Sequence, residues 1–263
     1  MLPAPFAATG GIRPESEPVH ELPIWREGFA FYDSFLLYTS TVFYGLGVPR
    51  GDGSVVVTVP GFLGTDTYMV GFRQWLSRMG YRPYQSSIGR NADCPNSLLQ
   101  RLLATIAEAH ADTGKRVHLV GHSLGGILAR SAGSHRPDLV ASVTTLGAPF
   151  RGIRSHPIVL RTHDVVRQIV FARDDNQFLP AGCYTGACTC AFVEALDRFP
   201  REVRELAIYS RSDGVVDWRM CVTGEAVKDR EVLGTHVGLA FNPFVYRFVA
   251  EFLAEQAASV RVA

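Results

Sequence analysis

The chain has 263 residues, of which 47% are hydrophobic and 19% are charged, and its formal net charge is +1. This composition excludes a disordered chain, and the small net charge gives no global attraction to nucleic acid or to an anionic membrane surface. The length is sufficient for one α/β domain with a large buried core.

Residues 1–20 contain four prolines and predict a flexible N-terminal arm, followed by a single domain over residues 21–263. The arm lacks the basic segment and following apolar segment of a secretory signal. We therefore expect a cytoplasmic protein.

The segment of residues 24–44 is aromatic and apolar at helical spacing. Its uncharged part, residues 34–48, is shorter than the roughly 20 apolar residues that a membrane-spanning helix needs. We expect the apolar side chains to pack against a sheet, with contact to a lipid surface as the alternative. The residues at this spacing are Trp25, Phe29, Tyr32, Phe35, Leu36 and Phe43.

The segment Ser-Val-Val-Val-Thr-Val at 54–59, which is β-branched from residue 55, predicts a fully buried strand, and a glycine-rich loop follows at residues 60–64. A loop of this kind after an early buried strand can supply half of an oxyanion hole, since its backbone amides face the reaction centre. The Phe62 amide is the candidate donor. An ordinary turn at the end of a strand is the alternative.

Helices and strands then alternate. An amphipathic helix over residues 69–79 ends at Gly80, a short strand covers residues 81–85, and a second helix runs from Asn96 as its N-cap to Gly114. This alternation predicts a parallel sheet with helices on both faces.

The strongest motif is Gly-His-Ser-Leu-Gly at residues 121–125, which ends an apolar strand at residues 117–121 and precedes a helix. A strand, a tight turn and a helix in this order lift the Ser123 hydroxyl clear of the backbone. The Leu124 amide, at the start of the helix, is the second candidate oxyanion donor. His122 is interpreted as the variable position of the motif, and a serine that only caps the helix is the alternative.

Two further strands are predicted at residues 139–146 and 206–209. More than fifty residues separate them, which is far longer than an ordinary connection. We therefore predict an inserted cap or lid over residues 150–204 that covers the active site. Its apolar stretch at residues 158–171 would line a pocket or face the core.

An acid and a histidine follow the last strands. Asp213 comes directly after the strand at residues 206–209, with Asp217 as the alternative acid or as the cap of a turn. His236 follows a short strand at residues 232–233 and precedes a terminal helix from residue 244. Such an acid accepts the Nδ1–H of the histidine, which in turn takes the proton of Ser123. The remaining histidines are interpreted as surface or packing residues.

These motifs resemble those of α/β-hydrolases of the bacterial serine esterase/lipase type, from residue 55 to the end of the chain. The resemblance rests on residues 121–125, on Ser-Asp-Gly at 212–214 and on Thr-His at 235–236. It implies an α/β-hydrolase fold with a mostly parallel sheet, a Ser123–His236–Asp213 triad and an oxyanion hole of Phe62 and Leu124.

The resemblance further implies hydrolysis of a small-molecule or lipid ester through an acyl-enzyme. No cofactor, metal or nucleic-acid partner is implied, and the oligomeric state is not indicated. Acyl transfer, cleavage of thioesters or amides by the same triad, and a non-catalytic protein on the same fold are the alternatives.

The five cysteines are Cys94, Cys183, Cys188, Cys190 and Cys221. Three of them are closely spaced in the predicted cap, which is compatible with a disulfide or, with Cys221 as the fourth ligand, with a zinc site. Free thiols are the default for a chain without a secretory signal.

Overall fold

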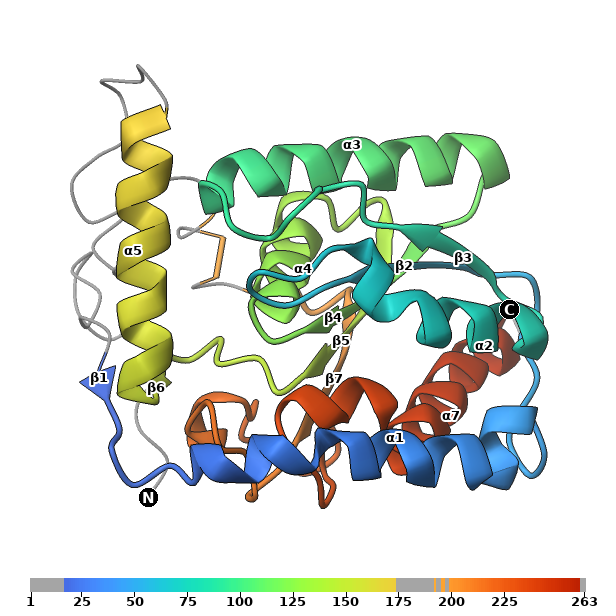
Figure 1. Cartoon of the computed structure of the whole chain (residues 1–263). Helices are drawn as coiled ribbons and strands as arrows, with labels where there is room; N and C mark the ends of the chain where they lie inside the picture. Colours follow the sequence, from blue (N-terminus) through green and yellow to red (C-terminus); the bar gives the residue numbers. More distant parts are fainter. Residues whose placement is uncertain (1–16, 174–191, 193–194, 197–198, 261–263) are drawn as a thin grey trace.

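The fold is built on a six-stranded sheet in the order β3-β2-β4-β5-β7-β8, in which each strand is parallel to its neighbours (Figure 1). We describe it in a computed structural model, for residues 17–173, 192, 195–196 and 199–260. The strands are β2 (Val55–Val59), β3 (Arg82–Gln85), β4 (Val117–His122), β5 (Val140–Leu146), β7 (Arg204–Tyr209) and β8 (Asp229–Glu231).

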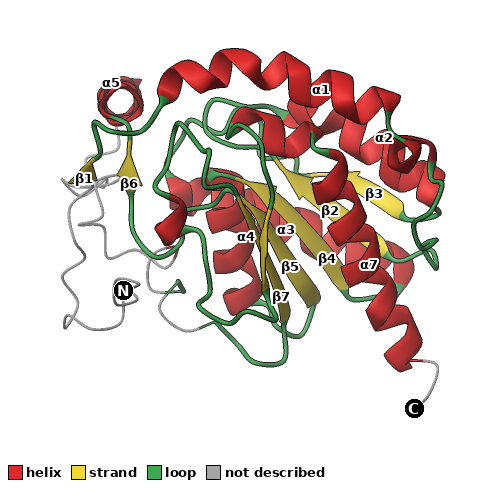
Figure 2. Ribbon diagram, turned by 90° about the horizontal axis from the view of Figure 1, so that it is seen from below, coloured by secondary structure: helices red, strands yellow, loops and turns green. Residues whose placement is uncertain are grey.

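Helices cover both faces of this sheet (Figure 2). On one face lie α3 (Pro95–Thr113) and α4 (Leu124–His135), and on the other lie α2 (Val70–Met79) and α7 (Pro243–Val260). Alternate residues of β2 serve the two cores, with Val55 and Val57 towards α3 and α4 and Val56 towards α2 and α7. This double burial explains the continuous β-branched run. The predicted fold class is confirmed.

Two predicted boundaries are wrong. Helix α3 begins at Pro95 with Cys94 as its N-cap, so Asn96 lies inside the first turn. Proline suits the first helical position because its missing N–H would have no partner there. The last strand, β8, ends at Glu231, immediately before the two apolar residues that we predicted to form it.

The helical segment near the N-terminus forms as expected, but the prediction of which side packs inward is wrong. It consists of the 3-10 helix η2 (Ile24–Phe29), α1 (Ala30–Thr39) and the 3-10 helix η3 (Thr41–Tyr44). Trp25 and Phe35 are 67% and 60% exposed, whereas Asp33 and Leu37 are buried. The sheet face is already covered by α2 and α7, so α1 packs instead on the 3-10 helix η6 (Val237–Phe241).

The predicted arm and the predicted cap meet in a small second sheet. Strand β1 (Glu17–Pro18) pairs in parallel with β6 (Arg154–Ser155). Along the chain, β6 follows β5 and precedes β7, which are neighbours in the main sheet. Helix α5 (Pro157–Arg173) follows β6. Residues 1–16 of the arm and 174–191 of the cap lie outside the described residues. Within the described residues, no helix is both long and apolar enough to cross a membrane.

Candidate active site

Ser123 occupies the turn between β4 and α4 with φ 52° and ψ −124°. A positive φ at a residue with a Cβ is strained, and such strain persists only where neighbouring structure enforces it. Here the Ser123 N–H donates to the Leu146 carbonyl at 2.8 Å, and the Ser123 carbonyl accepts from the Gly126 N–H at 2.9 Å. The turn is therefore held by the adjacent strand and by the start of the helix.

Close backbone contacts around this turn require glycine. A Cβ at Gly121 would lie 2.4 Å from the Gly125 carbonyl oxygen and 2.5 Å from the Gly126 Cα. A Cβ at Gly125 would lie 2.4 Å from the carbonyl oxygens of both Val59 and Pro60. Strand β4, helix α4 and the loop after β2 consequently approach one another more closely than side chains would permit.

We expect Gly121→Ala to destabilise the protein, because the added methyl group collides with backbone atoms that cannot move aside. The expected loss is at least about 2 kcal/mol, or about 4–8 °C in Tm. Gly28→Ala is the control, since a Cβ there meets no atom within 4 Å. Thermal unfolding followed by circular dichroism measures both, and equal Tm values would contradict the expectation.

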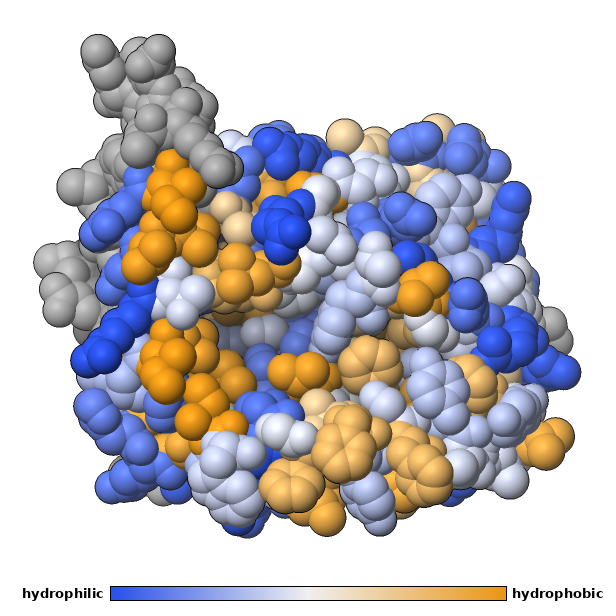
Figure 3. All heavy atoms as spheres, viewed as in Figure 1, coloured by the Kyte–Doolittle hydropathy of each residue, from blue (hydrophilic) through white to orange (hydrophobic). Residues whose placement is uncertain are grey.

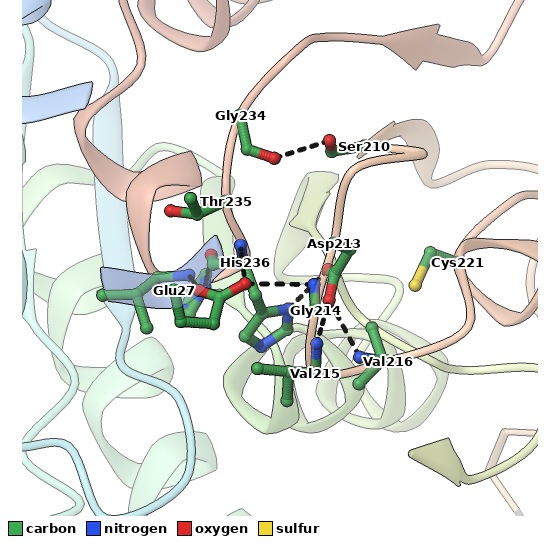
Figure 4. Close-up of polar contacts among 12 residues, drawn as sticks. Glu27, Ser210, Asp213, Gly214, Val215, Val216, Cys221, Gly234, Thr235 and His236 are labelled. Carbon is green, nitrogen blue, oxygen red and sulfur yellow. Dashed lines mark hydrogen bonds and ion pairs between the residues drawn. The ribbon is translucent and has the colours of Figure 1, made fainter. Parts of the chain in front are cut away.

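The Asp213 and His236 side chains are hydrogen-bonded to each other, with Oδ2 of the acid 2.6 Å from Nδ1 of the imidazole (Figure 4). The other carboxylate oxygen accepts the N–H groups of Val215 and Val216, both at 2.8 Å. Both side chains are buried. An ionised carboxylate only accepts hydrogen bonds, so Nδ1 carries the proton and Nε2 is left to act as a base.

The electrostatic surroundings favour protonation of His236. Burial by itself lowers its pKa, but the Asp213 charge and hydrogen bond, together with the Glu27 charge, raise the pKa above its ordinary value. The negative charge beside the imidazole stabilises an imidazolium ion at this position.

The predicted site residues border one cavity of about 250 Å³. Ser123, His236, Phe62 and Leu124 all line it, and Asp213 lies behind His236. The rest of the lining is mostly apolar and includes Ile127, Pro149, Ile153, Val159, Val215, Val216 and Val237.

Phe62 and Leu124, whose amides are the predicted oxyanion donors, both line this cavity. Among the described residues, neither N–H donates a hydrogen bond to another group of the chain. Gly61 packs directly on the turn, since a Cβ there would lie 3.1 Å from the Ser123 Cβ. Leu124 is the first residue of α4, where the helix leaves its amides unpaired.

Asp217, the alternative acid, serves another purpose. Its carboxylate accepts the Arg219 N–H at 3.0 Å and caps the 3-10 helix η5 (Trp218–Met220). It also forms an ion pair with Arg154 of β6 at 3.4 Å. These contacts tie the loop after β7 to the small second sheet.

His122 and Tyr68 contact the His236 loop, which the sequence did not predict. The His122 Nε2–H donates to the His236 carbonyl at 2.8 Å, and the Tyr68 hydroxyl donates to the Val237 carbonyl at 2.7 Å. Burial and the nearby His236 lower the pKa of His122 to about 3, so its ring is neutral. The interpretation of His122 as a merely variable position therefore missed a structural contact.

The predicted cap contacts the loop after β2 through His163 of α5. Its ring stacks on Phe62 with the centroids 3.6 Å apart and the planes 18° apart. Burial lowers the pKa of His163 to about 4 against the opposing charge of Asp164, so a neutral ring covers Phe62. Helix α5 thus closes one side of the cavity, which Val159 and His163 both line.

The cysteines are only partly described. Cys221 is a free, buried thiol, and burial raises its pKa, with the charges of Asp213 and Asp217 adding to the effect. Cys183, Cys188 and Cys190 lie outside the described residues. Within the described part of the chain, no group of three histidine, cysteine or acidic side chains could hold a metal ion.

Curated relatives match part of the chain. A triacylglycerol lipase from Pseudarthrobacter phenanthrenivorans is 38% identical over 106 residues, which are 37% of this chain and 33% of that protein. A triacylglycerol lipase from Burkholderia plantarii is also 38% identical over 106 residues, which are 37% of this chain and 30% of that protein. The match spans about a third of the length of these relatives.

Solved structures resemble a larger part of the chain than the curated relatives do. Est1E from Butyrivibrio proteoclasticus has a TM-score of 0.55 at 18% identity, over 80% of this chain and 92% of that chain. The mature Bacillus licheniformis lipase BlEst2 has a TM-score of 0.55 at 18% identity, over 79% of this chain and 94% of that chain. At this identity the likeness shows the fold alone.

The model of the alpha/beta hydrolase family matches residues 25–262, which include the turn at Ser123, the Asp213–His236 pair and the glycine-rich loop at Phe62. Because this match covers nearly the whole chain, the chain belongs to the alpha/beta hydrolase family.

Proposed function

We propose that the chain is a serine hydrolase that cleaves carboxylic esters through an acyl-enzyme on Ser123. The main support is that Ser123, on its strained turn, and His236, held by Asp213, border the same apolar cavity. The names of the relatives, which are triacylglycerol lipases, favour the same reaction class.

The first half of the reaction forms the acyl-enzyme. His236 Nε2 takes the proton of Ser123 as Oγ attacks the ester carbonyl carbon, and Asp213 stabilises the resulting imidazolium. The Phe62 and Leu124 amides bind the oxyanion of the tetrahedral intermediate. Each such donor contributes on the order of 3 kcal/mol to lowering the barrier.

The second half regenerates the enzyme. The imidazolium of His236 gives its proton to the departing alcohol, and the imidazole then activates a water molecule that attacks the acyl-serine. The acid is released and Ser123 recovers its proton.

Ester substrates with apolar groups suit the surroundings of the site. The cavity is lined by side chains such as Leu124, Ile127 and Val159. Outside it, apolar side chains gather over α5 and over α1 on either side of a hollow (Figure 3). The exposed ones include Ile158, Val165 and Ile169 on α5 and Phe31, Tyr32 and Phe35 on α1.

A fluorophosphonate probe and a chain-length series of p-nitrophenyl esters test the proposal. We expect the probe to label Ser123 and the protein to release p-nitrophenol. Running the series with and without an oil–water interface compares soluble with aggregated esters, and a competing alcohol reveals any acyl transfer. An absence of both labelling and turnover would refute the proposal.

The pH dependence of kcat/KM follows from the raised pKa of His236. Only the neutral imidazole can take the Ser123 proton, so the rate falls as the pH falls through this pKa. We expect the midpoint of the acid limb above the ordinary histidine value of about 6.5. A pH–rate profile with an ester that does not itself titrate measures it, and a midpoint below that value would contradict the expectation.

A further inference from the structure

The carboxylate of Glu27, on η2, binds the main chain of both loops that bear the Asp213–His236 pair (Figure 4). Its Oε1 accepts the Gly214 N–H at 3.0 Å and the His236 N–H at 2.9 Å. Its Oε2 accepts the Val237 N–H at 2.9 Å. One side chain, 187 positions from Gly214 and 209 positions from His236 in the sequence, thus joins the residue after the acid to the histidine itself.

The surrounding backbone is fitted to this contact. A Cβ at Gly214 would lie 2.6 Å from the Pro23 carbonyl oxygen and 2.9 Å from the Ile24 Cα, so η2 rests directly on the acid loop. Further along, the buried Asp33 accepts the Thr235 N–H at 3.3 Å and the Thr235 hydroxyl at 2.9 Å. The segment is therefore fastened to the histidine loop at two points.

The two loops depend on such a connection. They follow different strands, β7 and β8, and the 2.6 Å hydrogen bond between Asp213 and His236 requires both to be held in register. A carboxylate that accepts three backbone N–H groups makes charge-assisted hydrogen bonds, which are stronger than neutral ones. Misplacing a reacting group by about 1 Å can cost about a hundredfold in rate.

We propose that Glu27 is a positioning residue of the hydrolase, whose carboxylate locks the Asp213 loop to the His236 loop and so orients the imidazole towards Ser123. This inference rests on the proposed function.

Glu27 can act on His236 through its hydrogen bonds to the backbone and through its negative charge, and a pH–rate profile separates these two effects. The Glu27 charge is one of those that raise the pKa of His236. Among the described residues, the titratable and charged groups that contact His236, its loop or the same cavity include Asp213 after β7, Glu27 on η2, Asp33 on α1, Tyr68 on the 3-10 helix η4 (Asp66–Met69), His122 on β4 and His163 on α5. Loss of the Glu27 charge lowers the pKa of His236.

The test compares kcat, KM and pH profiles of Glu27→Gln with those of the unaltered protein. The glutamine side chain has one accepting oxygen, and its NH₂ group faces a backbone N–H to which it cannot hydrogen-bond, because both groups are donors. We expect kcat to fall about 10–100-fold with little change in KM, and the acid limb of kcat/KM to move to lower pH. Titration with a fluorophosphonate counts the active sites, so loss of folded protein is corrected for.

Two further variants make the result specific. Glu27→Asp keeps the charge but shortens the side chain by one methylene group, so kcat should fall while the acid limb stays in place. This variant tests the role of Glu27 if Glu27→Gln does not fold. Glu17→Gln removes a charge from the same N-terminal region, where the exposed Glu17 side chain forms an ion pair with Arg154 at 3.1 Å, and should leave kcat and the profile unchanged.

The outcomes distinguish this inference from the proposed function. Suppose that the unaltered protein is active. If Glu27→Gln then has the same kcat and the same acid limb as the unaltered protein, or if Glu27→Asp has the same kcat, the role of Glu27 is overturned and the proposed function is not. An unaltered protein that neither turns over esters nor takes up the probe overturns both.

Discussion

Replacing Ser123 with alanine is expected to lower the rate of ester hydrolysis at least about a thousandfold, because no acyl-enzyme can then form. The change removes one hydroxyl group from a residue that lines the cavity, and the backbone that holds the turn is untouched. The Phe62 and Leu124 amides remain in place, so any residual rate reflects binding and oxyanion stabilisation alone.

The measurement is the initial rate with a p-nitrophenyl ester, together with labelling by a fluorophosphonate. Ser134→Ala is the matched control, because Ser134 lies on the same helix and its hydroxyl donates only to the Arg130 carbonyl one turn earlier. The control should keep its activity and its labelling. Unchanged turnover in Ser123→Ala would exclude this serine as the nucleophile.

Replacing Asp213 with asparagine is expected to lower kcat by about 10³–10⁴-fold, although the side chain keeps its shape. The amide oxygen can still accept the Val215 and Val216 N–H groups, which leaves the NH₂ group facing His236 Nδ1. The imidazole must then accept at Nδ1 and carry its proton on Nε2. That tautomer cannot take the proton of Ser123.

Asp217→Asn is the matched control for this variant, since Asp217 lies in the same loop and was the alternative acid. Its contacts are with Arg219 and Arg154, so the change should lower Tm and leave kcat largely intact. Steady-state kinetics and thermal unfolding of the two variants separate the roles. Equal losses of kcat in both would contradict the assignment of Asp213 as the acid.

The fold could be predicted from the sequence because the central strands have clear patterns of buried residues. The continuous β-branched run of β2 and the valine-containing strands β4 and β5 indicate burial on both faces of a parallel sheet. The Gly-x-Ser-x-Gly motif marks the sharp turn between β4 and α4. The order of Ser123, Asp213 and His236 along the chain could also be read directly, since each follows a predicted strand. In a parallel sheet, all of these strands end at the same edge.

The orientation of the N-terminal helix could not be read in this way. Residues 24–44 have apolar side chains on nearly every side, so the period alone does not select the buried face. The structure buries Asp33 and Leu37 and exposes the aromatic stripe, because Asp33 hydrogen-bonds Thr235 and the sheet is already covered by other helices. Two acidic residues in an apolar segment, Glu27 and Asp33, were the available signal.

The sequence by itself determined the alternation of strands and helices, the strained turn at Ser123 and the residue types of the candidate site, since these depend on neighbours in the chain. Only the tertiary structure decided that Glu27 and His122 hold the His236 loop and that His163 stacks on Phe62. Each of these contacts joins segments that lie about a hundred residues or more apart in the chain. Local periodicity carries no information about such pairs, because they form only when the sheet brings its loops together.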